Sequence, residues 1–371
     1  MNAKTLYSPS LKGKANDLKA LGKIPRSLAP HVHALVELLS PNQDESIETA
    51  CVRFADQLRK HCPQNAVSVD LHSIAPEHVT NDGSPALEAL CANLRGLGIL
   101  FTPVFGFDHE PELWDRIAPI AARQGRGLTF RLKIDDLEAG EDTIADIVER
   151  LRYAGIPTSD TKILIDLESL GGLDAVSLVR LRGLTQDFID DALTVAKFGL
   201  ISVIGSSMPK DVSGVEKEDT KAFYRQEMPL WLNVATGVPS EGIAFGDYGI
   251  VHPNFSDKII PKHPNAKIRY TRGLHHHIFR GYSLREGLKY QQYYELARRV
   301  LGSQVYMGRD YSFGDDYAWR CANGEASCGN LGTWVEVDMN HHMVHVAAQM
   351  PQILTRVAAG VSANELLALT M

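Results

Sequence analysis

The chain has 371 residues, 44% of them apolar and 22% charged, a composition typical of a globular protein that buries a full core. Its 38 lysines and arginines stand against 45 aspartates and glutamates, which gives a formal net charge of −7 at pH 7. This net charge argues against broad nonspecific nucleic-acid binding, which needs a positive surface. A local basic pocket is still compatible with it.

Eight short apolar runs with polar residues at alternate positions recur through the first 250 residues and predict β-strands. The predicted strands are Thr5–Ser8, His33–Leu39, Val67–Ile74, Ile99–Phe105, Gly127–Ile134, Lys162–Leu167, Leu200–Ser206 and Gly242–Tyr248. The helices predicted between them are a first stretch that carries Leu18 and Leu21, then Glu45–His61, Pro85–Leu97, Pro111–Gln124, Thr143–Ala154, Ala175–Phe198 and Thr220–Ala235. Strand–helix alternation at this spacing predicts an α/β protein, a parallel (β/α)8 TIM-like barrel.

Glycines and prolines stand where this assignment needs helices to end and begin. Gly98, Gly155 and Gly199 each follow a predicted helix, at the usual place of a left-handed cap. Pro85 and Pro111 stand at predicted helix starts, where proline fits the first turn. The local signals therefore agree with the barrel.

The pattern changes after the eighth strand. We expect a barrel over residues 1–252 and, over 253–371, a C-terminal α+β extension that packs on the barrel without folding independently. The elements predicted in the extension are a helix Leu284–Leu301, strands Trp334–Asp338 and His342–Val346, and a helical stretch Gln349–Leu369.

Charged and polar side chains gather at the predicted strand ends. Side chains alternate across a strand, so the apolar positions that face the helices define which neighbours face the barrel axis. The side chains predicted to face the axis are Ser68, Asp70 and His72 on the third strand, Thr129, Arg131 and Lys133 on the fifth, and Asp166 and Glu168 on the sixth. Four more polar residues end their own strands: Glu37, Ser206, Ser207 and Asp247. Barrel interiors are normally filled by Val, Ile and Leu, so these groups must pair, bind a ligand or meet water at the barrel mouth.

The residue types indicate a phosphate-bearing ligand. Arg131 and Lys133 suit phosphate or carboxylate groups, and Ser206 and Ser207 add hydroxyls. Further positive charge is expected from Lys12 and Lys14 on the loop after the first strand and from Arg309 on a glycine-bounded loop, although solvated lysines and a plain surface turn are the alternatives.

The carboxylates indicate a metal and a base. Asp166, Glu168 and Asp247 are hard oxygen ligands that suit Mg²⁺, and Glu37, Asp70, Asp166 and Glu168 are the candidate catalytic carboxylates. The alternative is a closed network of salt bridges with a purely structural role.

Histidine and cysteine groups elsewhere predict no strong metal site. In the run His275-His276-His277 only the outer two share a face of a strand. His341 and His345 are expected on a strand, where four residues set them too far apart to share a metal. Cys321 and Cys328 lack zinc-finger spacing.

The sequence contains no GxxxxGK phosphate loop, GxSxG elbow, HExxH or GxGxxG motif, which weakens the NTPase, α/β-hydrolase, zincin and simple Rossmann interpretations.

No apolar stretch approaches the ~20 residues that span a bilayer, and the N-terminus lacks the apolar segment of a signal peptide. The odd number of cysteines, five, with Cys51, Cys62 and Cys91 in or beside predicted helices, indicates a reducing compartment. We therefore expect a cytoplasmic protein with no membrane partner.

The chain resembles the phage "beta protein" family. The resemblance is carried by Tyr7-Ser8-Pro9-Ser10-Leu11-Lys12-Gly13-Lys14 with Leu18, Ala20 and Leu21, by Leu35-Val36-Glu37, and by the distal stretches Arg280-Gly281-Tyr282, Gln292-Tyr293, Tyr306-Met307-Gly308, Phe313-Gly314-Asp315, Gly329-Asn330, Trp334 and His341-His342. This chain has Asn16-Asp17 where the family often has Gly-Glu. The resemblance implies an association with mobile elements, satellite phages and bacterial anti-phage cassettes, and hence a neighbouring defence-system protein as partner. It brings no established reaction.

Three functions are consistent with these observations. The first is a component of a defence or toxin–antitoxin-like system whose barrel binds a phosphate-bearing ligand such as a nucleotide, either without turnover or with hydrolysis assisted by a metal such as Mg²⁺. The second is a non-enzymatic sensor or partner-binding subunit of the same system. The third is a metabolic barrel enzyme, a lyase or phosphodiesterase.

Overall fold

A computed structural model describes residues 4–41, 44–62, 66–74, 78–238, 242–254 and 264–370. Its centre is a closed barrel of eight parallel strands, in the order β1-β2-β3-β4-β5-β6-β7-β9. The barrel strands are β1 (Tyr7–Leu11), β2 (Ala34–Glu37), β3 (Val67–Asp70), β4 (Phe101–Phe105), β5 (Thr129–Leu132), β6 (Lys162–Ser169), β7 (Leu200–Ser206) and β9 (Ala244–Asp247). The predicted barrel is confirmed.

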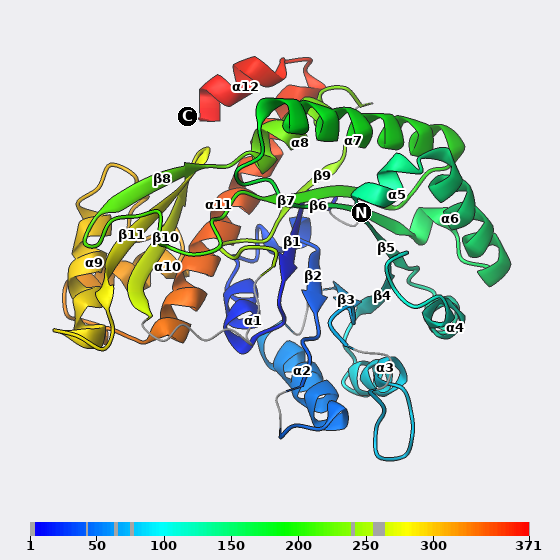
Figure 1. Cartoon of the computed structure of the whole chain (residues 1–371), viewed down its shortest axis with the longest axis horizontal. Coiled ribbons are helices and arrows are strands. Elements are labelled where there is room, and N and C mark those ends of the chain that lie inside the picture. The colour runs from blue at the N-terminus through cyan, green and yellow to red at the C-terminus, as the bar shows by residue number, and fades with distance from the viewer. Residues whose placement is uncertain are drawn as a thin grey trace.

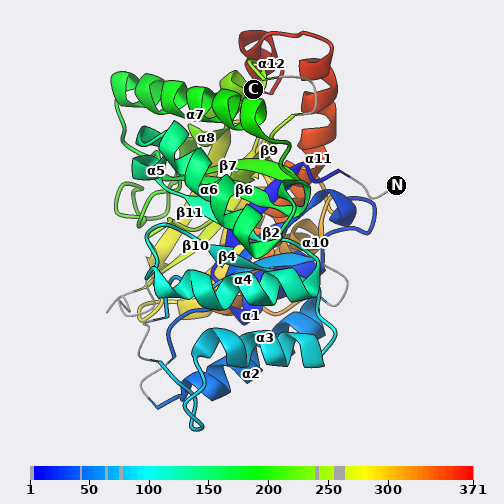
Figure 2. The same ribbon diagram turned by 90° about the vertical axis from the view of Figure 1, so that its right-hand side faces the viewer.

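Helices surround the strands, with α2, α3 and α4 on one side of the barrel and α6, α7 and α8 on the other (Figures 1 and 2). The helices are α1 (Ala15–Gly22), α2 (Ile47–His61), α3 (Ala86–Gly96), α4 (Glu112–Gln124), α5 (Ile134–Glu138), α6 (Glu141–Ala154), α7 (Ala175–Val195) and α8 (Glu227–Ala235), with 3-10 turns at Ala29–His31, Thr158–Asp160 and Lys289–Gln291. The longer helices, such as α2, α4 and α6, bury an apolar stripe toward the core, as amphipathic helices do.

The helix boundaries follow the expected signals with one exception. Pro85 and Pro111 precede α3 and α4 directly, and Gly98 and Gly155 have φ of 68° and 65°, the left-handed conformation that follows a helix. Gly199 does not have a positive φ. A Cβ at Gly199 would overlap the backbone oxygen of Ser159, so glycine is needed there because two backbones approach closely.

The barrel interior is layered. A lower layer of hydroxyls is hydrogen-bonded within itself, with Ser68 Oγ 2.7 Å from Thr129 Oγ1 and Ser8 Oγ 2.9 Å from Ser202 Oγ. Above it the apolar layer consists of Leu35, Val104, Leu164 and Ile204, capped by the ring of Tyr248. On β2 and β6 the next inward position after this layer is a carboxylate. The apolar layer therefore separates the hydroxyls from the charged end of the barrel.

The extension forms a small antiparallel sheet covered by helices, at the left of the barrel in Figure 1. Its elements are β8 (Thr220–Tyr224), β10 (Asn265–Arg272), β11 (His275–Ser283), α9 (Gln292–Leu301), α10 (Phe313–Ala322), α11 (Leu331–Ala358) and α12 (Ala363–Thr370). It has an apolar cluster of its own, built around Tyr293 and Trp334, whose rings stack at 5.0 Å. The helix α11 lies between this sheet and the barrel, in contact with α1, β1 and β10.

Two strand predictions in the extension are wrong, because Trp334–Asp338 and His342–Val346 both belong to the helix α11. Every side chain from Val337 to Val346 is buried. A helix buried on all sides has no polar face, so the 3.6-residue signature that would reveal it is missing.

Two helix predictions began too early. In the predicted helix Thr220–Ala235, the first five residues form β8, which pairs with β11 and lends the extension a strand from within the barrel sequence. In the predicted helix Leu284–Leu301, the α-helix starts only at Gln292. The stretch Gln349–Leu369 is helical in two pieces, the end of α11 and α12. Across the described ranges no helix combines the length and the apolar character needed to cross a membrane.

Candidate ligand site at the C-terminal end of the barrel

Arg131 lies at the centre of an ion-pair network on the barrel axis. Its Nε donates to Asp166 Oδ2 at 2.9 Å, and its Nη1 donates to Glu37 Oε1 at 2.9 Å and to Asp70 Oδ2 at 2.7 Å. Its Nη2 donates to Tyr248 Oη at 3.1 Å. All five side chains are buried. The strands β2, β3, β5 and β6 thus bring three carboxylates and a guanidinium to one point, and Tyr248, directly after β9, adds a phenol. The alternation of side chains predicts this direction for Asp70, Arg131 and Asp166, and Glu37 is at its predicted strand end.

Two lysines extend the network toward solvent. Lys12, which directly follows β1, donates to Glu37 Oε2 at 2.8 Å. Lys133, which directly follows β5, donates to Asp166 Oδ2 at 2.9 Å and to Glu168 Oε1 at 2.8 Å. The side chain of Glu168 is 46% exposed and that of Lys133 19% exposed. The Lys133–Glu168 pair is therefore the part of the network that a ligand from solvent can reach.

The network keeps Asp70 and Asp166 ionised. Burial alone would raise the pKa of Asp166, but the charges of Arg131 and Lys133 outweigh it and hold this pKa below its usual range. Burial is likewise outweighed at Asp70, where Arg131 lowers the pKa of the carboxyl. Burial and the charge of Asp166 raise the pKa of Tyr248, so the phenol stays protonated and donates a hydrogen bond to Asp166.

The backbone at Glu168 is strained. Its φ is 54°, in the left-handed region that residues with a Cβ rarely adopt. The Glu168 N–H donates to Asp166 Oδ1 at 3.0 Å, and the side chain bonds to Lys133. These two contacts hold the residue there, and strain of this kind clusters at functional sites.

A second group of polar side chains lies beside the network, beyond the ends of β3 and β4. His109 Nε2 is 3.6 Å from Asp70 Oδ1, and His72 Nδ1 is 3.5 Å from Asp108 Oδ2. The rings of His72 and His109 stack at 5.6 Å. Burial lowers the pKa of His109, while Asp70 and Asp108 oppose that shift.

These residues line a cavity of about 730 Å³. Its lining consists of Leu71, His72, Ser73, Ile74, His78, Pro85, Ala86, Leu87, Asp108, His109, Glu110, Glu112, Leu113 and Arg116. Asp70 joins this cavity to the central network, because one of its oxygens faces His109 and the other Arg131.

Asp247 does not join Asp166 and Glu168. Its carboxylate accepts from Tyr7 Oη at 2.7 Å, bonds to His342 Nε2 at 2.9 Å and lies 3.5 Å from Arg225 Nη2. It therefore faces the extension, while the next residue, Tyr248, faces the axis. Alternation across β9 permits one of the two neighbours to point inward, and the sequence interpretation chose the wrong one.

The remaining predicted site residues hold the backbone or lie elsewhere. Ser206 Oγ accepts from Met208 N at 3.1 Å and Ser207 Oγ from Gln226 N at 2.9 Å, so both hydroxyls fix loops. Lys14 caps α1 beside the buried Asp17. Arg309 pairs with Asp316 at 2.8 Å on the exposed side of the extension, and in the described part of the chain no contact links it to the network.

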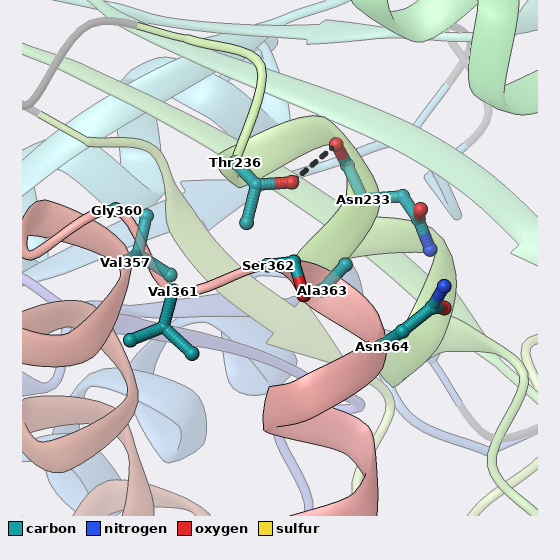
Figure 3. Close-up of a pocket in the computed structure, with 8 residues that line it drawn as sticks. All are labelled: Asn233, Thr236, Val357, Gly360, Val361, Ser362, Ala363 and Asn364. Atoms are coloured by element: carbon teal, nitrogen blue, oxygen red, sulfur yellow. Dashed lines mark hydrogen bonds between the residues drawn. The ribbon is translucent and has the colours of Figure 1, made fainter.

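Another cavity, of about 380 Å³, lies between α8, the end of α11 and the start of α12 (Figure 3). It is lined by Asn233, Thr236, Val357, Gly360, Val361, Ser362, Ala363 and Asn364. None of these side chains ionises, and none contacts the network. It therefore offers no acid–base or ionic chemistry.

Sequence reasoning missed Tyr248, His109 and Asp108. Tyr248 ends the predicted eighth strand, so testing both possible faces of that strand would have found it. Asp108 and His109 lie three and four residues beyond β4, in a loop where strand alternation no longer applies. Their signal was a histidine next to an acid shortly after a strand end, where TIM-like barrels carry their sites.

The fold and this geometry define an α/β barrel protein whose C-terminal mouth is closed by a buried ion-pair network. The chain belongs to the Beta protein family, whose family model matches residues 7–348. This match confirms the resemblance, and it runs from the first barrel strand into α11, so the family unit includes both the barrel and most of the extension. A search among curated proteins finds no match.

Proposed function

We propose that this protein binds a small phosphate-bearing ligand, such as a nucleotide, at the C-terminal end of its barrel, as a component of a bacterial or phage defence system or of a toxin–antitoxin-like system. Membership of the Beta protein family supports the setting. The ion-pair network supports the position of the site, because TIM-like barrels carry their sites at this end.

One observation carries the proposal: three cations and four carboxylates converge at one end of a barrel, a fold whose interior is normally filled by apolar side chains. Lys12, Arg131 and Lys133 meet Glu37, Asp70, Asp166 and Glu168 within hydrogen-bonding distance. Replacing buried ion pairs by well-packed apolar groups is often neutral or stabilising by about 1–4 kcal/mol. A network of this kind is therefore better explained by a ligand than by stability.

The exposed pair at the rim suggests how the ligand enters. A phosphate group takes the place of the Glu168 carboxylate on Lys133, and Lys12 adds a second positive charge at the mouth. Arg131 keeps its contacts with Asp166, Asp70 and Glu37 and positions the acids. Glu168, released from Lys133, is the carboxylate with enough exposure to accept a proton from water, which makes it the base for hydrolysis.

The proposal does not use Mg²⁺ on the carboxylates named from the sequence. The oxygens of Asp166 already bond to Arg131, Lys133 and Tyr248, and Asp247 faces the extension. A metal at Asp166 would have to displace the buried Arg131 and the partly exposed Lys133.

Titration calorimetry at low salt with inorganic phosphate, pyrophosphate and a panel of nucleoside mono-, di- and triphosphates tests the proposal. We expect at least one ligand to bind, and Lys133→Met to weaken it about tenfold or more, the loss of one charge-assisted hydrogen bond. Lys162→Met is the matched control, because Lys162 opens β6 at the opposite end of the barrel. Lack of binding by every ligand, or equal losses in both variants, contradicts the proposal.

A non-enzymatic sensor or partner-binding subunit is the second candidate. It is favoured by the closure of the network, in which Arg131, Asp166 and Asp70 find all their partners within the protein. Co-purification with the product of a neighbouring gene, unchanged when Asp166→Asn and Glu168→Gln remove the two charges, would favour this function over ligand binding.

A further inference from the structure

We propose that His72, Asp108 and His109 form a binding site for a divalent first-row transition metal such as Zn²⁺, at the wall of the 730 Å³ cavity beside the ion-pair network. The metal would lie beside the proposed phosphate site, off the barrel axis.

The spacing of the three side chains fits a metal. One ligand atom from each lies within 4.8 Å of those of the other two, and in the part of the chain that the structure describes this is the group of three with such spacing. Two ligand atoms about 2.1 Å from a tetrahedral Zn²⁺ are about 3.4 Å apart. His72 Nδ1 and Asp108 Oδ2, at 3.5 Å, already have this separation. Small side-chain movements bring in the third ligand.

The surroundings orient the ligands. Asp70 accepts from the His72 backbone N–H at 2.9 Å and faces His109 Nε2 at 3.6 Å, so one buried carboxylate positions both histidines. The Gly106 N–H donates to His109 Nδ1 at 3.2 Å, which makes Nδ1 the unprotonated nitrogen and places the proton on Nε2, toward Asp70. A metal on Nδ1 takes the place of this Gly106 hydrogen bond. A carboxylate behind the protonated nitrogen is the usual support of a metal-bound histidine.

Gly106 makes the turn possible. A Cβ at this position would lie 2.5 Å from Asp108 Oδ1 and 3.0 Å from the Arg131 backbone oxygen. Glycine thus allows the chain after β4 to fold back, which places Asp108 and His109 over the end of β3.

The chemistry of the cavity favours a cation with nitrogen affinity. Two imidazoles and one carboxylate suit Zn²⁺ and its first-row neighbours, whereas Mg²⁺ prefers oxygen ligands. The cavity also carries Glu110 and Glu112 against one guanidinium, Arg116. Half-exposed His72 and Asp108 leave the remaining coordination positions open to the cavity. A site with three protein ligands and open positions is typical of catalytic metals.

The link between this metal and phosphate rests on the proposed function. A bound divalent ion would turn an acidic cavity into a place for a phosphate oxygen and lower the pKa of a bound water, which would supply the nucleophile for hydrolysis. Metal binding itself stands on the three ligands alone.

The test is titration of the chelator-treated full chain with Zn²⁺ by calorimetry, and with Co²⁺ by visible absorption. We expect one ion per chain and a Co²⁺ spectrum without the intense charge-transfer band of cysteine ligation. His72→Ala and Asp108→Asn, both at exposed positions, should each weaken binding by about 100-fold or more, since even outer-shell partners are worth about 10- to 100-fold. The double variant His275→Ala/His277→Ala removes the same kind of side chain on β11 and should bind as the wild type does.

The outcomes separate the two proposals. No tight Zn²⁺ binding, or equal binding by the wild type and the His72 and Asp108 variants, overturns the metal site even if phosphate ligands bind the metal-free protein. Zn²⁺ binding that needs His72 and Asp108, together with no affinity for any phosphate ligand, supports the metal site and contradicts the proposed function.

Discussion

Arg131 carries one positive charge and faces three buried carboxylates, so it cannot balance their negative charge alone. Lys12 and Lys133 supply the other two cations. Burial would lower the pKa of Arg131, but Asp166, Tyr248 and Asp70 outweigh it and raise this pKa further. The charge states of Arg131, Asp166 and Asp70 thus depend on one another.

Arg131→Met should therefore be strongly destabilising. Removing one partner of a buried ion pair leaves uncompensated charge and typically lowers the free energy of unfolding by about 3–5 kcal/mol. Urea unfolding at pH 7 measures the loss. Arg152→Met is the control, because Arg152 is 65% exposed and meets Glu149 only at 4.0 Å. Its variant should lie within about 0.5 kcal/mol of the wild type, and equal stability of the two variants would refute the central role of Arg131.

At the scale of residues, strand alternation predicted which side chains of the strands meet on the barrel axis. Asp70, Arg131 and Asp166 lie on strands whose outward neighbours are apolar, so their direction could be derived. Asp108 and His109 could not be found in this way, because their positions depend on the turn at Gly106. Asp247 was misdirected because its partner His342 is 95 residues away in sequence.

At the scale of elements, the loop between β1 and α1 depends on Gly13. Its φ is 63°, and a Cβ would lie 2.7 Å from Phe54 Cε2 and overlap the backbone oxygen of Glu37. This glycine therefore lets the loop carry Lys12 against Glu37. The buried Asp17 accepts hydrogen bonds from the backbone of Lys12 and Lys14 and holds the same loop from the other side.

Gly13→Ala should lower the free energy of unfolding by about 1–3 kcal/mol or more, since left-handed strain adds to the overlap. Gly183→Ala is the opposite case, because Gly183 lies inside α7, where a Cβ meets nothing within 4 Å. That variant should gain up to about 1 kcal/mol from helix propensity. Thermal unfolding of both proteins measures the effects, and a neutral Gly13→Ala would show that the loop is not constrained as described.

The long helices of the barrel could be predicted because they have an apolar and a polar face, and its strands because polar residues recur within short apolar runs. The helix α11 could not, because it is buried on both sides, against the small sheet and against α1. This assignment also changes the relation of His341 and His345. On a helix their rings lie 6.0 Å apart on one face, rather than at the separation that a strand imposes.

At the scale of the whole molecule, buried polar contacts join the barrel to the extension. Asp247 on β9 bonds to His342 on α11, and Glu227 on α8 lies 3.6 Å from His276 on β11. Thr271 Oγ1 links the two histidines, at 3.1 Å from His276 and 2.8 Å from His342.

A fragment of residues 1–252 should therefore fail to fold cooperatively. It keeps Asp247, Arg225 and Glu227 but loses His342, His276 and the cover that α11 gives to β1 and α1. Near-ultraviolet circular dichroism and thermal unfolding of the fragment against the full chain test this expectation. A sharp unfolding transition of the fragment would show that the barrel is an independent domain.

The same contacts make stability depend on pH. Burial lowers the pKa of His276 to about 4, against about 6.5 for an unperturbed histidine, with Glu227 opposing the shift. The unfolded chain therefore binds more protons between these values. The contribution of neutral His276 is complete above pH 6.5 and is lost as the pH falls toward 4.

His276→Gln should remove this dependence while keeping a polar side chain next to Thr271. From pH 7.5 to pH 5.0 the wild type should lose about 2 kcal/mol more than the variant. Urea unfolding of both proteins at the two pH values gives the difference, in which groups common to both cancel. An identical loss in the two proteins would mean that His276 does not titrate in this way.

The closure of the barrel has a consequence for its synthesis. β1 pairs with β9, with Tyr7 opposite Phe245, so the first strand and the last meet only after about two thirds of the chain exists. At about 5–20 residues per second, a ribosome leaves the free edge of β1 exposed for roughly 10 to 50 s. Open strand edges invite pairing with other chains. The nascent chain therefore carries an open strand edge that the closed barrel does not have.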